Sequence, residues 1–412
     1  MLGEKIENHN MHLYTKGQCL DFIETAHRDR VYPLIYCHIE LGGLLDIAHL
    51  IEAVRLSSRY VPEILFSYDF KQGKFIEHGL TADDIVIVER HGLGRGWRWD
   101  LDTGPQLKIG ITQESGKSSV LIGMSHILSD GAGFLQYLYL LTALYNGDPV
   151  PYALKNVREI APILNTAGAA TQQERNGKKA NTQRLALGGC GEIYQCLTVT
   201  LDVDTMETIQ TKAKQTGATL NDVFLAAYAR IVAKEWNTDR VLLPCPADLR
   251  RFCPVSDTLT IANMTGRYEI AVELQTRYSF AELLQQVQIE MTLQKGRRRC
   301  FSGISFLQGI STKVPVRLLE YLCKQFYHIL PLSYTNFGVV DAERFRFQDC
   351  LIKNCFLTGT YRVSPDFQMS VSTFRGVCTL SSPMIGSAER ISKGQNILER
   401  IKIELTNWTG EN

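Results

Sequence analysis

A histidine and an aspartate stand four residues apart in the stretch 125–131, Ser-His-Ile-Leu-Ser-Asp-Gly, which forms an H-x-x-x-D-G motif. The apolar run 119–124 before the motif predicts a buried strand, and the run 132–141 after it predicts a helix. His126 therefore lies at the end of a strand, where a rigid scaffold can hold it. An imidazole held in this way is the commonest general base in proteins. The motif indicates proton transfer by His126.

Two other interpretations of the motif start from the same residues. A lone histidine in an apolar region is most often a core residue with satisfied ring nitrogens. His126 and Asp130 could also both ligate zinc, but no third ligand stands nearby at a suitable spacing, and no metal site is predicted. The place at a strand end, beside the small residues Gly131 and Gly133, favours a catalytic base.

The composition is typical of a folded protein with two domains. The chain has 412 residues, more than one core usually holds, with 45% hydrophobic and 21% charged residues. Its 44 basic and 43 acidic residues leave a net charge of +1, so no general attraction for nucleic acid or an anionic membrane is expected. The basic run 295–299 is a local exception.

The cysteines and the apolar runs bear on the compartment. Eleven cysteines are scattered without C-x-x-C spacing, and an odd number cannot all pair within the chain, which favours a reducing cytoplasm. No stretch approaches the roughly 18 apolar residues of a membrane span, and the first residues lack the apolar core of a signal peptide. We expect a cytoplasmic protein without a transmembrane segment.

Strand and helix patterns alternate along the chain, which predicts an α/β (α+β layered) fold. We expect an N-terminal domain over 1–165 that carries the motif, a linker over 166–190, and a C-terminal domain over 191–412. The linker assignment rests on a run of small, polar and charged residues without periodicity. In the second domain, Thr219 is the predicted N-cap of a helix.

Several short segments, in order along nearly the whole chain, resemble motifs of the chloramphenicol-acetyltransferase-like superfamily. The likeness is greatest to its two-domain branch of stand-alone condensation domains, alcohol O-acyltransferases and polyketide-associated acyltransferases. Besides the H-x-x-x-D-G motif, the segments that carry the resemblance are 40–46 (E-L-G-G-L-L-D), 102–107 (D-T-G-P-Q-L), 217–223 (G-A-T-L-N-D-V), 246–251 (P-A-D-L-R-R), 261–266 (I-A-N-M-T-G) and 332–338 (L-S-Y-T-N-F-G).

The resemblance implies two domains, each a mixed sheet covered by helices, with a tunnel between them. In that tunnel an acyl group would move from a thioester to a hydroxyl or amine, with His126 as base. Asn336 would donate a hydrogen bond to the oxyanion, and Ser333, Thr335 and Gly338 would contact the substrate. For Asn336 the alternative is a turn residue that closes a strand before Gly338, while Gly131 is expected to allow a tight backbone turn.

Asp130 has two possible roles. By analogy with catalytic triads it would orient His126. The resemblance favours a structural role, in which the carboxylate points away from the histidine and pairs with Arg250 or Arg251. Loss of Asp130 would then damage the folding of the site more than proton transfer.

The residue before the motif and the basic run bear on the substrates. Peptide-forming relatives carry a second histidine where this chain has Ser125, which favours O-acyl over N-acyl transfer. No permanently bound cofactor is expected; acyl-CoA or a phosphopantetheinyl acyl carrier protein would be the co-substrate. The run 295–299 would meet its phosphates or an acidic carrier-protein helix, or else is a solvated loop.

Two further functional interpretations stay open at this point. One is a free-standing condensation enzyme that forms an amide between carrier-bound substrates. The other is a non-catalytic condensation-like module that docks partners. In either enzymatic case we expect a small-molecule acceptor, no nucleic acid, and a monomer, since two fused domains can build the whole site.

Overall fold

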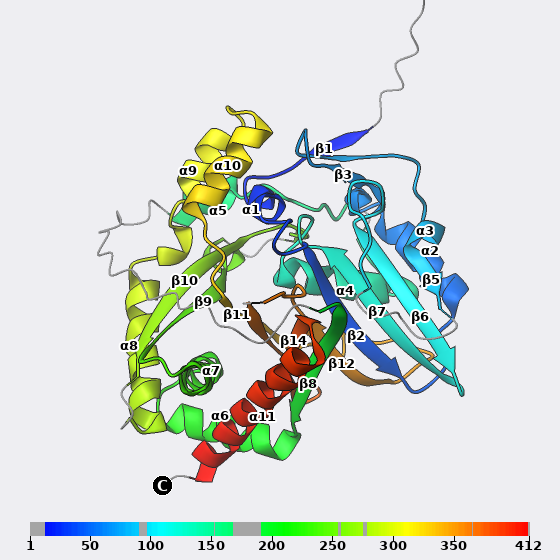
Figure 1. Ribbon diagram of the computed structural model, residues 1–412. Helices are drawn as coiled ribbons and strands as arrows, with labels where there is room; N and C mark the ends of the chain where they lie inside the picture. The colour runs from blue at the N-terminus through cyan, green and yellow to red at the C-terminus, as the bar shows by residue number, and fades with distance from the viewer. Residues whose placement is uncertain are drawn as a thin grey trace, which may run out of the picture.

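The computed structural model describes residues 13–89, 97–151, 153–167, 191–253, 257–274, 278–364 and 366–410. Two larger sheets with helices beside them dominate the fold, and elements from both halves of the chain meet at the centre of the molecule (Figure 1). Mixed sheets and covering helices make this an α/β protein, as the sequence predicts. Within these ranges, no helix combines the length and hydropathy that crossing a bilayer requires.

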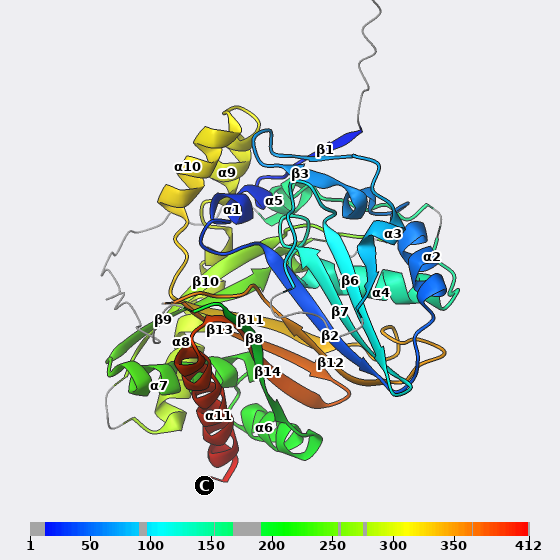
Figure 2. The same ribbon diagram turned by 45° about the vertical axis from the view of Figure 1, so that its right-hand side comes forward.

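The first sheet has the strand order β12-β2-β7-β6-β5 and is antiparallel except for the β5–β6 pair. Its helices α2, α3 and α4 lie beside it (Figure 2) and share its apolar core. The bounds are β2 Leu34–Leu41, β5 Val86–Val88, β6 Leu107–Glu114, β7 Lys117–Ser125, β12 Ile352–Thr358, α2 Ile47–Ser57, α3 Ala82–Ile85 and α4 Gly131–Tyr145.

Strand β7 delivers the motif because its register is fixed at both ends. A two-residue turn, Ser115 and Gly116, joins it to β6, and both residues have positive φ, as a tight hairpin requires. Side chains alternate between exposed and buried from Lys117 to Val120, so a one-residue slip would expose the wrong face. The strand ends at Ser125, directly before His126.

The second sheet has the order β11-β13-β14-β8, with β11 and β13 parallel. Helices α6, α7 and α11 lie with it around a second apolar core, and the ribbon β9–β10 packs beside β11 with α8 (Figure 1). The bounds are β8 Ile193–Leu201, β9 Arg240–Asp248, β10 Thr265–Glu273, β11 Leu332–Val340, β13 Phe367–Phe374, β14 Val377–Gly386, α6 Val203–Gln215, α7 Leu220–Trp236, α8 Phe280–Gly296 and α11 Ala388–Gly410.

The predicted N-cap of α7 is confirmed. Thr219 accepts a hydrogen bond from the Asp222 backbone N–H, and the Asp222 carboxylate accepts one from the Thr219 backbone N–H. This capping box satisfies two of the orphan N–H groups that every helix start leaves.

The remaining elements cover the end of the molecule where α1 lies. Helices α9 and α10 form a hairpin that packs on α1 (Figures 1 and 2). The bounds are β1 Tyr14–Lys16, β3 Ser67–Asp69, β4 Lys74–Ile76, α1 Asp21–Ala26, α5 Ala161–Ala167, α9 Ile304–Ser311 and α10 Val316–Phe326, with 3-10 helices at Pro62–Leu65, Leu249–Phe252 and Arg299–Phe301.

The chain crosses between the two halves more than the proposed domain limits imply. Strand β12 lies within 191–412, yet it pairs with β2 and forms the edge of the first sheet. Conversely, Cys19 and Leu20 from the start of the chain pack in the core of the second half. Of the proposed linker, 166–167 end helix α5, and 168–190 lie outside the described residues.

The β12 crossover makes a prediction about stability. Leu357 is fully buried in β12, so Leu357→Ala removes packing between the second half of the chain and the first sheet. We expect a loss of about 2–5 kcal/mol in the free energy of unfolding, measured by urea titration. Lys353→Ala, at an exposed position on the same strand, is the control and should change it little. An equal loss in both variants would contradict this role.

Candidate active site

His126 lies at the start of the loop between β7 and α4. Its backbone N–H donates to the Pro33 carbonyl at 2.8 Å, next to the pair formed by Leu34 of β2 and Ser125. The side chain is partly exposed, and its Nδ1 is buried without a hydrogen-bond partner among the described residues. The ring therefore has no side-chain partner at Nδ1 of the kind that orients a triad histidine.

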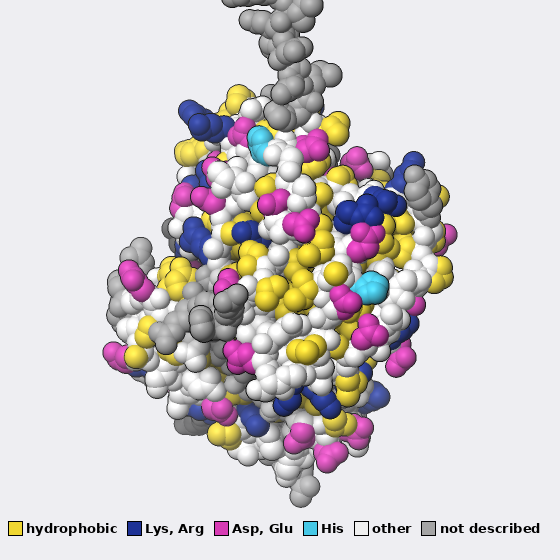
Figure 3. All heavy atoms as spheres, turned by 90° about the vertical axis from the view of Figure 1, so that its right-hand side faces the viewer, with side chains coloured by type: hydrophobic (Ala, Val, Ile, Leu, Met, Phe, Trp, Pro, Cys, Tyr) yellow, Lys and Arg dark blue, Asp and Glu magenta, His cyan; other side chains and the backbone are white. Residues whose placement is uncertain are grey.

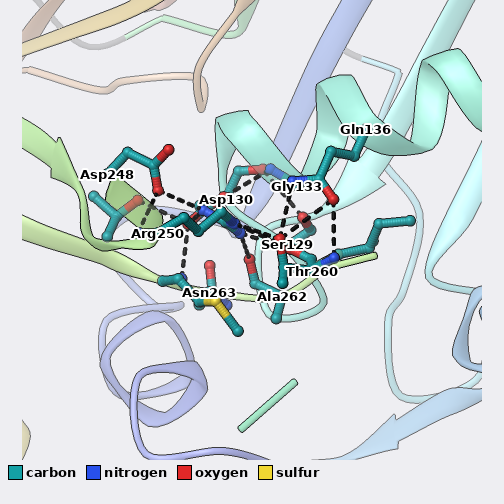
Figure 4. A network of polar contacts seen from close by, with 12 residues as sticks. Ser129, Asp130, Gly133, Gln136, Asp248, Arg250, Thr260, Ala262 and Asn263 are labelled. Carbon is teal, nitrogen blue, oxygen red and sulfur yellow. Dashed lines mark hydrogen bonds and ion pairs between the residues drawn. The ribbon is translucent and has the colours of Figure 1, made fainter. Parts of the chain in front are cut away.

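The Asp130 carboxylate is fully engaged elsewhere. It is 2% exposed and caps α4, because Oδ1 accepts from the Gly133 backbone N–H at 2.9 Å. Oδ2 accepts from Arg250 Nη1 at 3.0 Å, from the Met264 backbone N–H at 2.7 Å and from Thr265 Oγ1 at 2.8 Å (Figure 4). This is the geometry of the structural alternative and not of a triad.

Of the two arginines considered, Arg250 forms the ion pair, whereas Arg251 is exposed. Arg250 is the second residue of the 3-10 helix 249–252. Its guanidinium also donates to the carbonyls of Thr260 and Ala262 and to the Asp248 carboxylate (Figure 4). The Asp130 backbone N–H donates to the same Ala262 carbonyl at 3.1 Å. The pair thus joins the motif of the first half to the segment 248–265 of the second.

The electrostatics of Asp130 follow from this geometry. Burial by itself would raise the pKa of the Asp130 carboxyl. The charge of Arg250 and the hydrogen bonds from Arg250, Gly133 and Met264 act in the opposite direction and outweigh it. The pKa of Asp130 is therefore lowered, and the group is a carboxylate at neutral pH.

Gly131 is required for space. It does not have a positive φ, so the backbone at this residue does not need the conformational freedom of glycine. A Cβ at this position would lie 2.7 Å from Phe337 Cε1, closer than real contacts allow. The motif therefore touches β11, as expected from the segment 332–338, and the contact residue is Phe337.

Asn336 faces away from that contact. Its Nδ2 donates to Asn221 Oδ1 at 3.3 Å, and its Oδ1 accepts from the Gly338 backbone N–H at 2.8 Å. Tyr334 donates to the same Asn221 oxygen, so the even-numbered side chains of β11 point toward α7. Asn336 does not close the strand before Gly338: β11 continues to Val340 with a bulge between Asn336 and Gly338, and Gly338 has φ +77°, which suits glycine.

Ser333 and Thr335 have the opposite parity on β11. Both are partly buried. They pair with Gln368 and Ser370 of β13 and lie on the face opposite Tyr334, before the bulge that takes Phe337 out of the regular alternation. The contact of β11 with Gly131 is the Phe337 ring.

The basic run 295–299 ends helix α8 and begins a short 3-10 turn. Lys295 is exposed and lies near Cys245, which Asn221 contacts at 3.5 Å. Burial raises the pKa of the Cys245 thiol to about 11, and the Lys295 charge opposes that rise. Cys245 thus relates Lys295, at the start of the run, to Asn221, the hydrogen-bond partner of Asn336.

A cleft of about 590 Å³ lies between elements from both halves of the chain, and neither β11 nor the run 295–299 lines it. Leu34, beside the His126 loop, lines it, and rings of Tyr36, Tyr361 and Tyr194 contact one another along its wall. Its other lining residues are charged and apolar: Arg28, Asp29, Arg30, Tyr32, Phe70, Arg98, Asp100, Asp102, Val363 and Ile385.

The sequence did not reveal two residues that form a buried ion pair and hold the motif loop. Asp21 of α1 and Arg158, which precedes α5, form a second buried ion pair at 2.8 Å, and Arg158 donates to the Leu128 carbonyl. Neither residue stands in a recognisable local motif. No group of three potential metal ligands occurs in the part of the chain that the structure describes.

The comparisons with known proteins agree on the fold. No protein-family model matches the sequence. Surfactin synthase subunit 1 from Bacillus subtilis is 25% identical over 228 residues, which are 52% of this chain and only 6% of that much longer protein.

Solved structures match nearly the full chain. Polyketide synthase associated protein 5 from Mycobacterium tuberculosis has a TM-score of 0.69 at 15% identity and covers 95% of this chain and 98% of its own. The condensation domain of the Monacolin K polyketide synthase has a TM-score of 0.68 at 13% identity and covers 98% of this chain and 99% of its own. Trichothecene 15-O-acetyltransferase from Fusarium sporotrichioides has a TM-score of 0.67 at 11% identity and covers 98% of this chain and 97% of its own. The chain has the fold that these solved structures share, as the resemblance implied.

The Asp130–Arg250 pair generates a prediction. Asp130→Asn leaves a buried arginine uncompensated, and we expect a loss of about 3–5 kcal/mol in the free energy of unfolding near neutral pH. Because the folded pKa lies below the ordinary 3.8, this stabilisation is present above the unfolded pKa and is lost as pH falls through the folded pKa. Urea titrations from pH 7 to pH 3 should therefore show the two proteins converging in acid.

Asp248→Asn is the matched control, since Asp248 also contacts Arg250 at 3.0 Å but its side chain is 29% exposed. Its expected cost is about 0–1 kcal/mol. If Asp248→Asn cost as much as Asp130→Asn, the buried pair would not be the dominant contact of Arg250.

Proposed function

We propose that this chain transfers an acyl group from a thioester to a hydroxyl or amine, with His126 as general base. The observation that carries the proposal is a partly exposed histidine on an immobilised loop where the two halves of the molecule meet. The fold shared with an O-acetyltransferase and with condensation domains supports the reaction class.

The proposed chemistry needs no bound cofactor. His126 Nδ1 is buried, so we assign proton transfer to Nε2. Nε2 takes the proton from the acceptor as its oxygen or nitrogen attacks the thioester carbonyl. The tetrahedral oxyanion collapses, the carbon–sulfur bond breaks, and the imidazolium returns the proton to the departing thiolate. Such a base contributes roughly 10²- to 10⁴-fold to the rate.

As the hydrogen-bond donor to the oxyanion we favour Thr335 or Ser333 over Asn336. Both hydroxyls lie on the face of β11 opposite Tyr334, shortly before the Phe337 contact with Gly131, whereas the Asn336 amide is engaged with Asn221 and Gly338. A donor aimed at the developing negative charge is the usual largest single contribution to catalysis of acyl transfer. Asn336 then lines the opposite face of β11, beside Asn221.

We assign the two substrates to opposite sides of β11. The thioester donor, acyl-CoA or an acyl carrier protein, enters on the Asn336 side, where the run 295–299 supplies cations for its phosphates. The small-molecule acceptor enters through the tyrosine-lined cleft, which reaches Leu34 beside the His126 loop. Elsewhere, on the face in Figure 3, acidic and basic side chains are interspersed without a large patch of one sign.

Ester formation is our first choice. Ser125 is fully buried, and its Oγ accepts from the Ile127 backbone N–H at 3.2 Å, so the place of a second histidine is taken by a residue that shapes the turn. The match to surfactin synthase subunit 1 favours amide formation as the second candidate. Ten described cysteines form no disulfide, which supports the proposed cytoplasmic setting.

His126→Ala tests the proposal. Products are measured by mass spectrometry after incubation with panels of acyl-CoA and acyl carrier protein donors and with alcohols and amines. We expect kcat to fall at least about 10²-fold. His49→Gln, at an exposed histidine, should leave turnover unchanged. Undiminished turnover by His126→Ala would exclude the mechanism, and the absence of turnover with every donor would favour the docking-module interpretation.

A second test concerns the donor. Removing the charges of Lys295 and Arg299 together should raise KM for acyl-CoA at least about tenfold, since each charge-assisted hydrogen bond contributes roughly 1.5–3 kcal/mol and about 1.4 kcal/mol is tenfold. KM for a truncated thioester without phosphates should not change, and Lys214→Ala on α6 serves as the surface control. Equal effects on both donors would refute phosphate recognition by this run.

A further inference from the structure

Three consecutive backbone carbonyls of the motif loop are held by side chains from distant segments. Asn263 Nδ2 donates to the His126 carbonyl at 2.8 Å and to the Ile127 carbonyl at 3.0 Å. Arg158 Nη1 donates to the Leu128 carbonyl at 2.7 Å. Asn263 and Arg158 therefore fix the path of the backbone directly after the proposed base.

Asp21 connects these two donors. It is fully buried, and its Oδ1 accepts from Asn263 Nδ2 at 3.0 Å while its Oδ2 accepts from Arg158 Nη2 at 2.8 Å. Oδ2 also accepts from the Gln18 backbone N–H at 2.7 Å. One carboxylate thus orients both the amide and the guanidinium that hold the loop.

The His126 ring depends on this arrangement because no side chain orients it directly. Its Nδ1 has no hydrogen-bond partner in the described ranges, and both Asp130 oxygens are bonded elsewhere. The hydrogen bonds that the structure gives His126 are those of the backbone that carries it. That backbone is held at the His126 N–H by Pro33 and at the His126 carbonyl by Asn263.

We propose that Asp21, Asn263 and Arg158 are positioning residues that aim His126 through its backbone, in place of a triad carboxylate. The group of three is called the loop clamp below. Its kinetic consequence rests on the proposed acyl transfer, whereas its effect on the conformation of His126 does not. A displacement of the base by about 1 Å is expected to cost on the order of 10²-fold in rate.

The clamp also links the site to the helical hairpin. Asp21 is the first residue of α1, and the same helix packs Phe22 and Ala26 against Leu319 and Cys323 of α10. The ion pair of Arg28 with Glu320, at 2.7 Å, joins the same region of the chain to α10 without touching the motif loop. This pair provides a control that perturbs the packing of α1 but leaves the clamp intact.

The experiment uses Asn263→Ala and Asp21→Asn, with Asp21→Glu as the conservative variant and Glu320→Gln as the control. Urea titration first establishes that each variant is folded. The ring signals of His126 are then followed by NMR against pH and assigned by their loss in His126→Ala. Acyl transfer is measured as separate kcat and KM values for the donor.

We expect Asn263→Ala and Asp21→Asn to shift and broaden the His126 ring signals and to lower kcat by about 10²-fold with KM unchanged. Asp21→Glu should restore part of kcat, and Glu320→Gln should alter neither measurement. If Asp21→Asn does not fold, Asn263→Ala and Arg158→Lys decide the question.

Two outcomes would overturn the clamp: a folded Asn263→Ala protein with unaltered His126 signals, or a Glu320→Gln protein with an equal loss of kcat. If the wild-type protein turns over no thioester, the proposed function fails on its own. The NMR comparison still decides whether the clamp orients His126.

Discussion

The buried ion pair between Asp130 and Arg250 is the constraint on which the site depends. A single carboxylate caps α4, binds a guanidinium of the second half and accepts the backbone N–H of Met264, just before β10. Burying both charges is costly, and only the full set of hydrogen bonds compensates. The helix start, the motif loop and the neighbouring strand of the second half can therefore take only one mutual arrangement.

That arrangement determines how the histidine can work. A carboxylate committed to Arg250 cannot orient an imidazole, so the aspartate of the motif contributes to structure. In the proposed mechanism the histidine alone supplies the base. The second buried pair, Asp21 with Arg158, holds the other side of the same short loop. Two ion pairs around a few residues favour one loop conformation over alternatives more than they add to overall stability.

Strand β11 divides the surroundings of the loop into two sides. Phe337 packs on Gly131, while Tyr334 and Asn336 face Asn221 of α7. Before the bulge, alternation makes neighbouring side chains of β11 point to opposite faces, and the bulge at Phe337 then breaks that alternation.

Local patterns in the sequence were sufficient for many of the elements and for the position of the candidate base. The buried run of β7 placed His126 at a strand end, the Thr219 cap was correct, and the ordered motifs identified the fold. Each of these depends on neighbours in the chain, which periodicity and capping rules describe. The sequence also restricted the partner of Asp130 to Arg250 or Arg251, but burial of one guanidinium and exposure of the other made the choice.

Only the tertiary structure decided which distant groups meet. The pairing of β12 with β2, the approach of Phe337 to Gly131, the turn of Asn336 toward Asn221 and the clamp headed by Asp21 have no local signature. They follow from packing between segments far apart in the chain. An aspartate at the start of a short helix has the same sequence pattern whether it faces water or a buried arginine, and only the folded core distinguishes the two.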